Sequence, residues 1–563
     1  MGALTDLVEQ GSTPAAWACS CPACAGTSEQ DGGGGGAGGV TPGDFARTPT
    51  DNAFAYVASA NAQGSGGQVA PLMAGSKWSA VDAASGRTVI TYSFADPGSS
   101  VFSGTDASDF AKTLSAFSQA DRQMTRELLQ KIAQVCNVQF VEVADNAAQC
   151  GAIRYAYSDQ PTTLKFAGYA FYPSSTAAGG NVWIATAQAA AQWDFYRPDL
   201  VLHETLHAMG LKHPFSGDTV LASDQDIIPN TVMSYSPLAG SSTGSLSSYP
   251  AEPMAFDIAA LQYLYGASGQ ASGDDVYDLA GAQWQGGFHT LWDAGGRDTL
   301  DASRIGHGVS LDLHAGAHSD IGVTVTAQAL RADGSTQATT YHGTFTVAPG
   351  AQIENAIGTA GADRIVGNEL ANRIAGGAGD DTIDGAEGID TAVYAGSRAQ
   401  FEVQAQGATT VVRDLRGGDG TDTLANVERL QFSDGGLALD LDGNAGVAAK
   451  VLGVVFGKAA LANPDSVATE LAIADSGVTV EAMAQLAVDG RLGVGASHTA
   501  VVDLLFTNLT GHGPSAAEAA PFVAMLDHGM SAGALAALAA DHPLNAINIG
   551  LVGLAATGLA YAA

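Results

Sequence analysis

Basic residues are scarce in this sequence. Only 23 of its 563 residues are lysine or arginine, against 57 aspartates and glutamates, so the formal net charge is −34. Binding to phosphate backbones or anionic membranes needs clustered positive charge, which argues against nucleic acid as a partner and against a basic membrane anchor. An acidic chain with 71 glycines suggests metal sites with oxygen ligands, and calcium is the first candidate ion. The alternative is that the acidic residues only keep the protein soluble.

Long apolar runs are also missing. Met1–Ser20 has no lysine or arginine and no apolar core, so no secretory signal is predicted. The most apolar segment, Ile549–Ala563, is shorter than the roughly 20 residues needed to cross a bilayer. We therefore expect a packed C-terminal helix there and no integral membrane segment.

Cysteines number only five. Cys136 and Cys150 flank a strand-like run and could form a disulfide in an exported protein, or remain reduced. Cys19, Cys21 and Cys24 could ligate a metal, but the glycine-rich stretch that follows them favours a disordered, processed segment.

Changes in sequence pattern divide the chain into four segments. Residues 197–210 and 255–265 have helical spacing, and runs such as 88–94 read as strands, which together favour a mixed α/β or α+β domain. Short apolar runs with frequent glycine and aspartate follow, and alanine- and leucine-rich stretches come last. The predicted segments are a flexible leader or propeptide (1–75), a catalytic domain (76–266), a β domain (267–442) and a helical module (443–563).

The strongest motif is HETLHAMGLKH, which begins at His203. His203 and His207 are four residues apart, so they share one helix face and can reach the same ion. Gly210 lets the chain leave the helix and return His213 as a third ligand. Three neutral imidazoles leave one zinc position open for water, and Glu204 can accept a proton from that water.

A nine-residue period begins at Gly358. Four consecutive turns within 358–393 follow G-G-x-G-x-D-x-U-x, where U is a large apolar residue that stacks inward, while the aspartates and turn carbonyls bind Ca²⁺. Leu370 and Asn372 break the pattern in the second turn, so we expect the first and third turns to bind calcium better than the second and fourth. The candidate ligand positions are Gly358, Gly361, Asp363, Gly376, Gly379, Asp381, Gly385, Gly388 and Asp390.

These motifs together resemble serralysin-type secreted zinc metalloproteases, a branch of the metzincins with an RTX calcium-binding β-roll. The resemblance covers roughly residues 88–442 and includes TVMSY, which matches the family's Met-turn. It implies that Met233 lies beneath the metal and that Tyr235 approaches zinc and then stabilises the oxyanion. The string from 291 to 303 resembles the family's calcium-binding entry to the roll, which makes Asp293, Gly295, Gly296 and Asp298 ligand candidates, with Asp274 a weaker one.

We expect a multidomain protein. The resemblance implies a metzincin catalytic domain and a parallel β-roll; the C-terminal α-helical domain departs from the short serralysin ending and resembles a helical domain often attached to secreted RTX proteins. The implied function is a calcium-stabilised zinc endopeptidase that cleaves proteins and peptides, acts as a monomer, and is exported by type I secretion through a C-terminal signal. The leader also departs from the family, whose propeptide normally lacks cysteine, and we hypothesise that a thiolate from Cys19, Cys21 or Cys24 occupies the open zinc position before cleavage. The alternatives are a non-catalytic RTX surface-binding protein with a vestigial zinc site and a different RTX enzyme, such as a lipase.

Overall fold

The computed structural model describes residues 45–562, apart from 61–65, 105–108, 242 and 332–333. These residues form two compact units. The first unit runs to Asp275 and also contains Gly281–Gly296 and Ala315–Gln352, whereas the second contains Val276–Ala280, Arg297–His314 and Ile353–Ala563.

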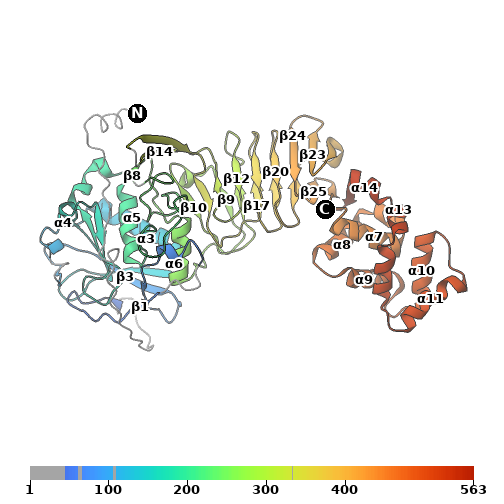
Figure 1. Cartoon of the computed structure of the whole chain (residues 1–563), viewed down its shortest axis with the longest axis horizontal. Coiled ribbons are helices and arrows are strands. Elements are labelled where there is room, and N and C mark those ends of the chain that lie inside the picture. Colours follow the sequence, from blue (N-terminus) through green and yellow to red (C-terminus); the bar gives the residue numbers. More distant parts are fainter. Residues whose placement is uncertain (1–44, 61–65, 105–108, 242, 332–333, 563) are drawn as a thin grey trace. The chain divides into compact units, whose positions relative to one another are not determined.

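A five-stranded sheet forms the centre of the first unit (Figure 1). Its order is β4-β3-β5-β7-β6, and only β6 at the edge is antiparallel to its neighbour. Every residue of β3, β5, β6 and β7 is buried, as expected of a sheet covered on both faces. The strands are β3 (Thr88–Phe94), β4 (Val138–Glu142), β5 (Ile153–Ser158), β6 (Gly168–Ala170) and β7 (Asn181–Ala185).

The main helices of this unit are α3 (Gln119–Val135), α5 (Arg197–Ala208) and α6 (Ala255–Tyr265). Helix α3 begins where the Ser118 hydroxyl accepts a hydrogen bond from the Asp121 backbone N–H. Helix α5 has a proline in its first turn and contacts α3, β6 and β7. The predicted mixed α/β character of this region is therefore observed. Short helices at α4 (Gln160–Thr163), η4 (Thr186–Ala189) and η5 (Ala191–Trp193) connect the larger elements.

Part of the predicted leader belongs to this folded unit. Strand β1 (Val57–Ser59) pairs with β2 (Ser76–Trp78), and Leu72 in η3 (Ala70–Leu72) is fully buried. The Arg47 and Cys150 backbones exchange hydrogen bonds of 3.0 and 2.7 Å. The prediction of a flexible leader over 1–75 therefore does not hold for the described residues of that segment, because their apolar side chains and backbone groups are partnered by the rest of the first unit.

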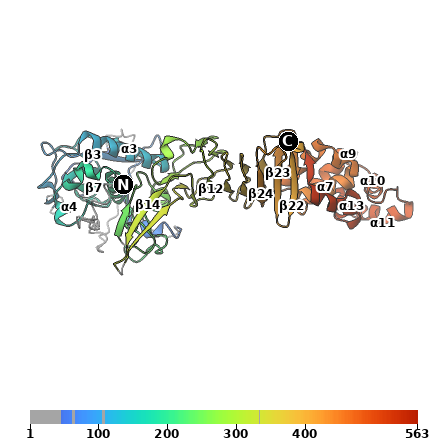
Figure 2. The same cartoon turned by 90° about the horizontal axis from the view of Figure 1, so that it is seen from above.

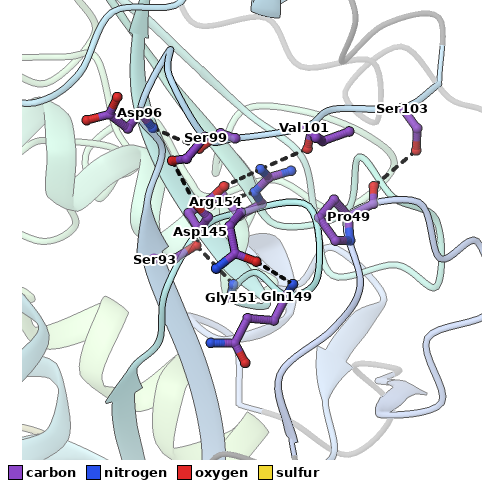
Figure 3. A network of polar contacts seen from close by, with 12 residues as sticks. Pro49, Ser93, Asp96, Ser99, Val101, Ser103, Asp145, Gln149, Gly151 and Arg154 are labelled. Carbon is purple, nitrogen blue, oxygen red and sulfur yellow. Dashed lines mark hydrogen bonds and ion pairs between the residues drawn. The ribbon is translucent and has the colours of Figure 1, made fainter.

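A buried ion pair braces the same region (Figure 3). The Arg154 guanidinium on β5 donates to both oxygens of Asp145, at 2.9 and 2.6 Å, and to the Val101 carbonyl at 3.0 Å. Asp145 also accepts a hydrogen bond from the Ser93 hydroxyl on β3. Because an unpartnered charge is costly in the interior, this network fixes the loops after β3 and β4. Ser103 donates from one of these loops to the Pro49 carbonyl.

Cys136 and Cys150 are both buried and free, so the disulfide alternative is not realised. They precede β4 and β5, and β3 lies between those two strands in the sheet. Adjacent strands are about 4.8 Å apart, so an intervening strand separates the two chain segments beyond the reach of a disulfide.

Residues 315–352 extend the first unit, so the boundary predicted at 266/267 is too simple. Strand β14 (Val325–Leu330) pairs antiparallel with both β15 (Thr336–Tyr341) and β8 (Thr243–Leu246). A second small sheet contains β10 (His289–Leu291), β16 (Phe345–Val347) and β13 (His318–Ser319), with η6 (Ala282–Trp284) before it. The pairing of β14 with β8 joins segments about 80 residues apart, which no local pattern indicates.

Two stacked sheets of short strands begin the second unit, in the green-to-orange part of Figure 1. Strands β18 and β20 pair in one sheet, and β19 and β21 pair in the other, all in parallel. Successive nine-residue turns therefore alternate between two sheets, which is the arrangement of a β-roll. The roll strands are β9 (Val276–Asp278), β11 (Thr299–Asp301), β12 (Ser310–Asp312), β17 (Asn355–Ile357), β18 (Arg364–Val366), β19 (Arg373–Ala375), β20 (Thr382–Asp384) and β21 (Thr391–Val393).

Antiparallel pairing, of β24 with β23 and of β25 with β26, closes the roll. The first sheet ends with β24, β23 and β22, and the second with β25, β26 and β27. Their bounds are β22 (Phe401–Gln406), β23 (Thr409–Asp414), β24 (Thr421–Ala425), β25 (Arg429–Phe432), β26 (Gly435–Ala438) and β27 (Leu559–Tyr561), with η7 (Arg398–Gln400) before β22.

Helices follow the roll in the same unit, around an apolar core of their own (Figure 2). They are α7 (Asn444–Phe456), η8 (Lys458–Ala462), α8 (Pro464–Asp475), α9 (Val480–Leu492), α10 (His498–Thr510), α11 (Ala516–Asp527), α12 (Ala532–Ala540), α13 (Pro543–Ile549) and α14 (Leu551–Thr557). Arg429 on β25 joins them to the roll by pairing with Asp475 of α8 and with Asp440.

The chain's last described segment is not the single helix predicted from its composition. Gly550 and Gly558 have φ values of 70° and 77°, so they end α13 and α14, and residues 559–561 return to the roll as β27. Among the described residues, none of the helices combines the length and apolarity required to cross a bilayer.

Candidate metal centre

Three histidines of the first unit, on α5 and in the segment that follows it, converge on one point. The Nε2 atoms of His203 and His207 lie 3.2 and 3.0 Å from Nε2 of His213, and all three side chains are buried. One ring nitrogen from each histidine lies within 4.8 Å of the other two, which is close enough for all three to hold one metal ion. The spacing predicted from sequence therefore brings these three residues together.

Backbone carbonyls set the orientation of two of these rings. Nδ1 of His203 lies 2.7 Å from the Val232 carbonyl, and Nδ1 of His207 lies 2.7 Å from the Leu211 carbonyl. Each Nδ1 must therefore carry the proton and donate it, which leaves the Nε2 lone pair facing the centre. Burial lowers the pKa of His203 to about 4 and holds the pKa values of His207 and His213 well below the ordinary value, so the rings are neutral.

The nitrogen spacing fits zinc. Two imidazole nitrogens at about 2.0–2.1 Å from one tetrahedral zinc would be about 3.3 Å apart, close to the observed separations. Gly210 makes this geometry possible because its φ is 105°, and a Cβ there would lie 2.2 Å from the Ser76 carbonyl oxygen. The chain can therefore turn sharply after α5 and place His213 beside the helix.

Glu204 lies on the buried side of α5 and is fully enclosed. Gly168 of the edge strand β6 approaches it so closely that a Cβ there would lie 2.6 Å from Glu204 Oε1. The absence of a side chain at residue 168 therefore keeps room for the carboxylate between α5 and the edge of the sheet. The sequence motif identified Glu204 but not this glycine.

Tyr235 also reaches the histidine cluster. Its hydroxyl lies 2.7 Å from His213 Nε2, and its ring stacks on His203 with centroids 5.6 Å apart. Met233 is fully buried in the same apolar core as Leu206 and Met209 of the metal-binding segment. The structure thus brings Tyr235 to the histidine cluster and buries Met233 in the core, and the position of Met233 beneath the metal stays a prediction.

Asp257 on α6 supports the Met-turn and was missed from the sequence. Its carboxylate accepts hydrogen bonds from the Thr231 hydroxyl at 2.6 Å and from the Val232 and Met254 backbone N–H groups at 2.9 Å. Burial raises its pKa to about 6, although these hydrogen bonds oppose the shift. Because the Val232 carbonyl orients His203, Asp257 acts on the metal centre through the Met-turn.

Replacing Asp257 by asparagine should weaken zinc binding about 10–100-fold, the usual effect of removing a partner of a metal ligand. The asparagine amide group would face backbone N–H donors at Val232 or Met254 and release the turn. Competitive titration with a chromogenic chelator measures this affinity. The matched control is Asp145→Asn, which removes a buried carboxylate from the Arg154 pair instead and should lower the melting temperature without changing zinc affinity. Equal zinc affinity in Asp257→Asn and wild type would contradict the assigned role.

The second unit carries a ladder of acidic groups at the sixth position of successive turns. The Asp363 N–H donates to Asp381 Oδ1 at 2.9 Å, and the Asp381 N–H donates to Asp422 Oδ1 at 3.1 Å. On the other sheet, Asn372 N–H donates to Asp390 Oδ1 at 2.7 Å. All these side chains are buried, so alternate turns bring the predicted aspartates into register.

Two of these carboxylates have an oxygen left over. Within the part of the chain that the structure describes, Asp381 Oδ2 and Asp390 Oδ2 are buried and have no hydrogen-bond partner. Burial raises the pKa of Asp381 to about 6 and that of Asp390 to about 7. A cation would satisfy these oxygens, so the donor set fits calcium.

The predicted glycines of the repeats pack against neighbouring turns or their own aspartates. A Cβ on any of them would lie within 2.8 Å of another atom, which shows how closely the turns stack. These glycines are Gly358, Gly361, Gly376, Gly379, Gly385 and Gly388.

A fifth repeat was missed. Residues 417–425 read GGDGTDTLA, which fits the nine-residue pattern, and β24 within them pairs in parallel with β20. The hairpin formed by β22 and β23 lies between the fourth and fifth turns and interrupts the period. A motif search that does not require consecutive turns would find Asp422, whose pKa burial raises to about 7.

The predicted entry to the roll contains Asp293, Gly295, Gly296 and Asp298. Gly295 donates its N–H to Asp293 Oδ1 at 2.7 Å, and Gly295 and Gly296 have φ values of 124° and 150°. Asp293 belongs to the first unit and Asp298 to the second, and both side chains are buried. Calcium binding at these residues, with Asp274 as the weaker candidate, stays a prediction.

Cys19, Cys21 and Cys24 lie outside the described residues, so the proposed zymogen ligand has no structural counterpart here. The sequence-based argument against a lipase, that no G-x-S-x-G string is present, is wrong, because residues 240–244 read GSSTG. Strand β8 begins inside this string, however, whereas a nucleophile elbow lies between a strand and a helix.

Comparison with known proteins agrees with these features. Residues 258–437 match the family model described as Peptidase M10 serralysin C terminal. The chain is 32% identical over 313 residues to Serralysin G of Dickeya chrysanthemi, which covers 50% of this chain and 59% of that relative. It is 30% identical over 291 residues to Serralysin of Proteus mirabilis, which covers 45% of this chain and 55% of that relative.

The chain therefore spans a little over half the length of these curated relatives, with 59% and 55% of them matched. A similar match, 29% identity over 284 residues, is found with Serralysin of Photorhabdus luminescens. The agreement of the family model with these relatives supports a serralysin-type family for this chain.

Proposed function

We propose that this protein is a zinc-dependent endopeptidase of the serralysin type. The observation that carries the proposal is the convergence of three neutral histidine Nε2 atoms. Glu204, which follows the first of these histidines on α5, adds an enclosed carboxylate. His203, His207 and His213 would hold the ion. When bound, zinc would polarise the substrate carbonyl and lower the pKa of a water at the open position.

Two residues would then serve the reaction. Glu204 would accept the proton of the attacking water at its carboxylate and pass it to the leaving amine. Tyr235 would leave His213 and donate a hydrogen bond from its hydroxyl to the developing oxyanion.

The β-roll would bind calcium at its sixth-position carboxylates. The unpartnered oxygens of Asp381 and Asp390 support this assignment, and Asp363 and Asp422 extend the same ladder. The resemblance of residues 291–303 to the family's calcium-binding entry to the roll makes Asp293 and Asp298 candidate ligands of a further calcium ion. Calcium would then stabilise the folded second unit.

By the same resemblance, we propose export as a monomer through type I secretion, with the signal in the C-terminal module. Protein and peptide substrates outside the cell follow from this assignment.

Casein hydrolysis tests the proposed activity. The purified full chain, loaded with zinc and calcium, should release peptides; o-phenanthroline should stop the release, and added zinc should restore it. A calcium-loaded protein that binds zinc but cleaves neither casein nor a peptide library would instead support the non-catalytic surface-binding alternative.

A further inference from the structure

The loop after the third histidine is held in place by a single ammonium group. Lys212 Nζ donates to the carbonyls of Pro71 at 2.6 Å, Thr219 at 3.1 Å and Ser216. The Leu221 N–H also donates to the Pro214 carbonyl at 2.9 Å, which closes the loop. These contacts fix the backbone of residues 213–221 around the lysine, so side chains on the loop have defined positions.

Phe215 on this loop covers the metal centre. Its ring is nearly parallel to that of His213, at 5° and a centroid distance of 5.1 Å, and it lies 5.1 Å from the ring of Tyr235. His213 is only 1% exposed, whereas Phe215 is 43% exposed. One part of the phenyl ring therefore packs on the two functional residues, and another part faces solvent beside them.

We propose that Phe215 determines substrate specificity by binding a large apolar side chain, aromatic or aliphatic, next to the scissile bond. This inference rests on the proposed peptidase function. A substrate bound at the histidine cluster must pass the exposed part of the ring, and burying that apolar surface against an apolar side chain is favourable. A ring held by stacking on His213 and by a tilted contact with Tyr235 loses little conformational freedom on binding, so its preference is for shape and apolarity.

Cleavage of a peptide library, analysed by mass spectrometry, tests the inference. We expect wild type to prefer a large apolar residue at one position flanking the cleaved bond. Phe215→Ala should lower kcat/KM for such peptides about tenfold or more relative to peptides with glycine or alanine there, as expected for lost apolar contact. Phe215→Leu should retain most of the preference, and zinc affinity should be unchanged in both variants.

Phe522→Ala is the matched control, because Phe522 is 38% exposed on α11 of the helical module. It should leave the cleavage profile unchanged. An equal loss of activity toward all peptides in Phe215→Ala, or an unchanged preference, would overturn the specificity role while the peptidase function stands. A zinc-loaded wild type that cleaves no peptide would overturn the peptidase function itself.

Discussion

Substitution of Glu204 by glutamine is expected to lower kcat/KM for peptide hydrolysis by about 10²–10⁴-fold, the range that general-base catalysis contributes. Glutamine has almost the shape of glutamate and fits beside Gly168, but it cannot accept the proton of the attacking water. The loss should fall on kcat, because the proposed zinc ligands and the other residues around them are unchanged.

Zinc content and thermal stability separate this effect from misfolding. Both should equal those of wild type, since the three histidines and their backbone partners remain. Glu142→Gln is a suitable control, because Glu142 lies at the end of β4 and pairs with Arg126 rather than with the cluster. Activity within a few-fold of wild type in Glu204→Gln would rule out Glu204 as the base.

Removal of calcium is expected to loosen or unfold the second unit while the first stays folded. Each site at tenfold excess of calcium over its Kd contributes about 1.4 kcal/mol, and several sites act on one stack of turns. Hydrogen exchange measured by mass spectrometry should show faster exchange in β18–β21 and β24 after chelation. Protection of these strands that is identical with and without calcium would contradict the assignment.

Two aspartates of the roll offer a matched comparison. Asp381 has an oxygen without a hydrogen-bond partner, and its pKa is raised by burial. Asp414 accepts hydrogen bonds from the backbone N–H groups of Arg416, Gly418 and Asp419, which lower its pKa to about 2. Asp381→Asn should reduce the stabilisation by calcium, whereas Asp414→Asn should destabilise the protein equally with and without calcium.

The carboxylates of Asp381 and Asp390 should make the stability of the calcium-free protein depend on pH. In the calcium-free folded state the pKa values of Asp381 and Asp390, about 6 and about 7, lie above the ordinary value of 3.8. The folded state therefore binds more protons than the unfolded state between about pH 4 and 7, so its free energy of unfolding falls as pH rises through this range. Thermal melts of calcium-free protein should give a lower melting temperature at pH 8 than at pH 5, and added calcium should restore stability at pH 8.

Local sequence patterns were sufficient to predict several helices and strands of the first unit. The apolar run 88–94 forms β3, and the helical spacing of 255–265 forms α6, with the bounds predicted. His203, His207 and Glu204 lie on one helix, so their relation follows from helical periodicity alone. The alternation of the nine-residue turns likewise follows from their own repeat.

The remaining features depend on contacts between distant segments. Asp257 reaches the Met-turn across 25 residues of sequence, and its hydrogen bonds to backbone groups leave no motif. Residues 45–75 contain few long apolar runs, yet they bury Leu72 and pair backbone groups with the loop after α5. The turn 417–425 was hidden because a hairpin separates it from the others, although its letters fit the repeat.

Stoichiometric zinc titration of the zinc-free, calcium-loaded protein tests the central claim most directly. Peptidase activity should rise linearly and level off at one zinc per chain, and a variant with alanine at His203, His207 and His213 should bind no zinc at this site and show no activity. Peptidase activity that is the same before and after zinc addition, or none at full zinc occupancy of the three histidines, would contradict the account.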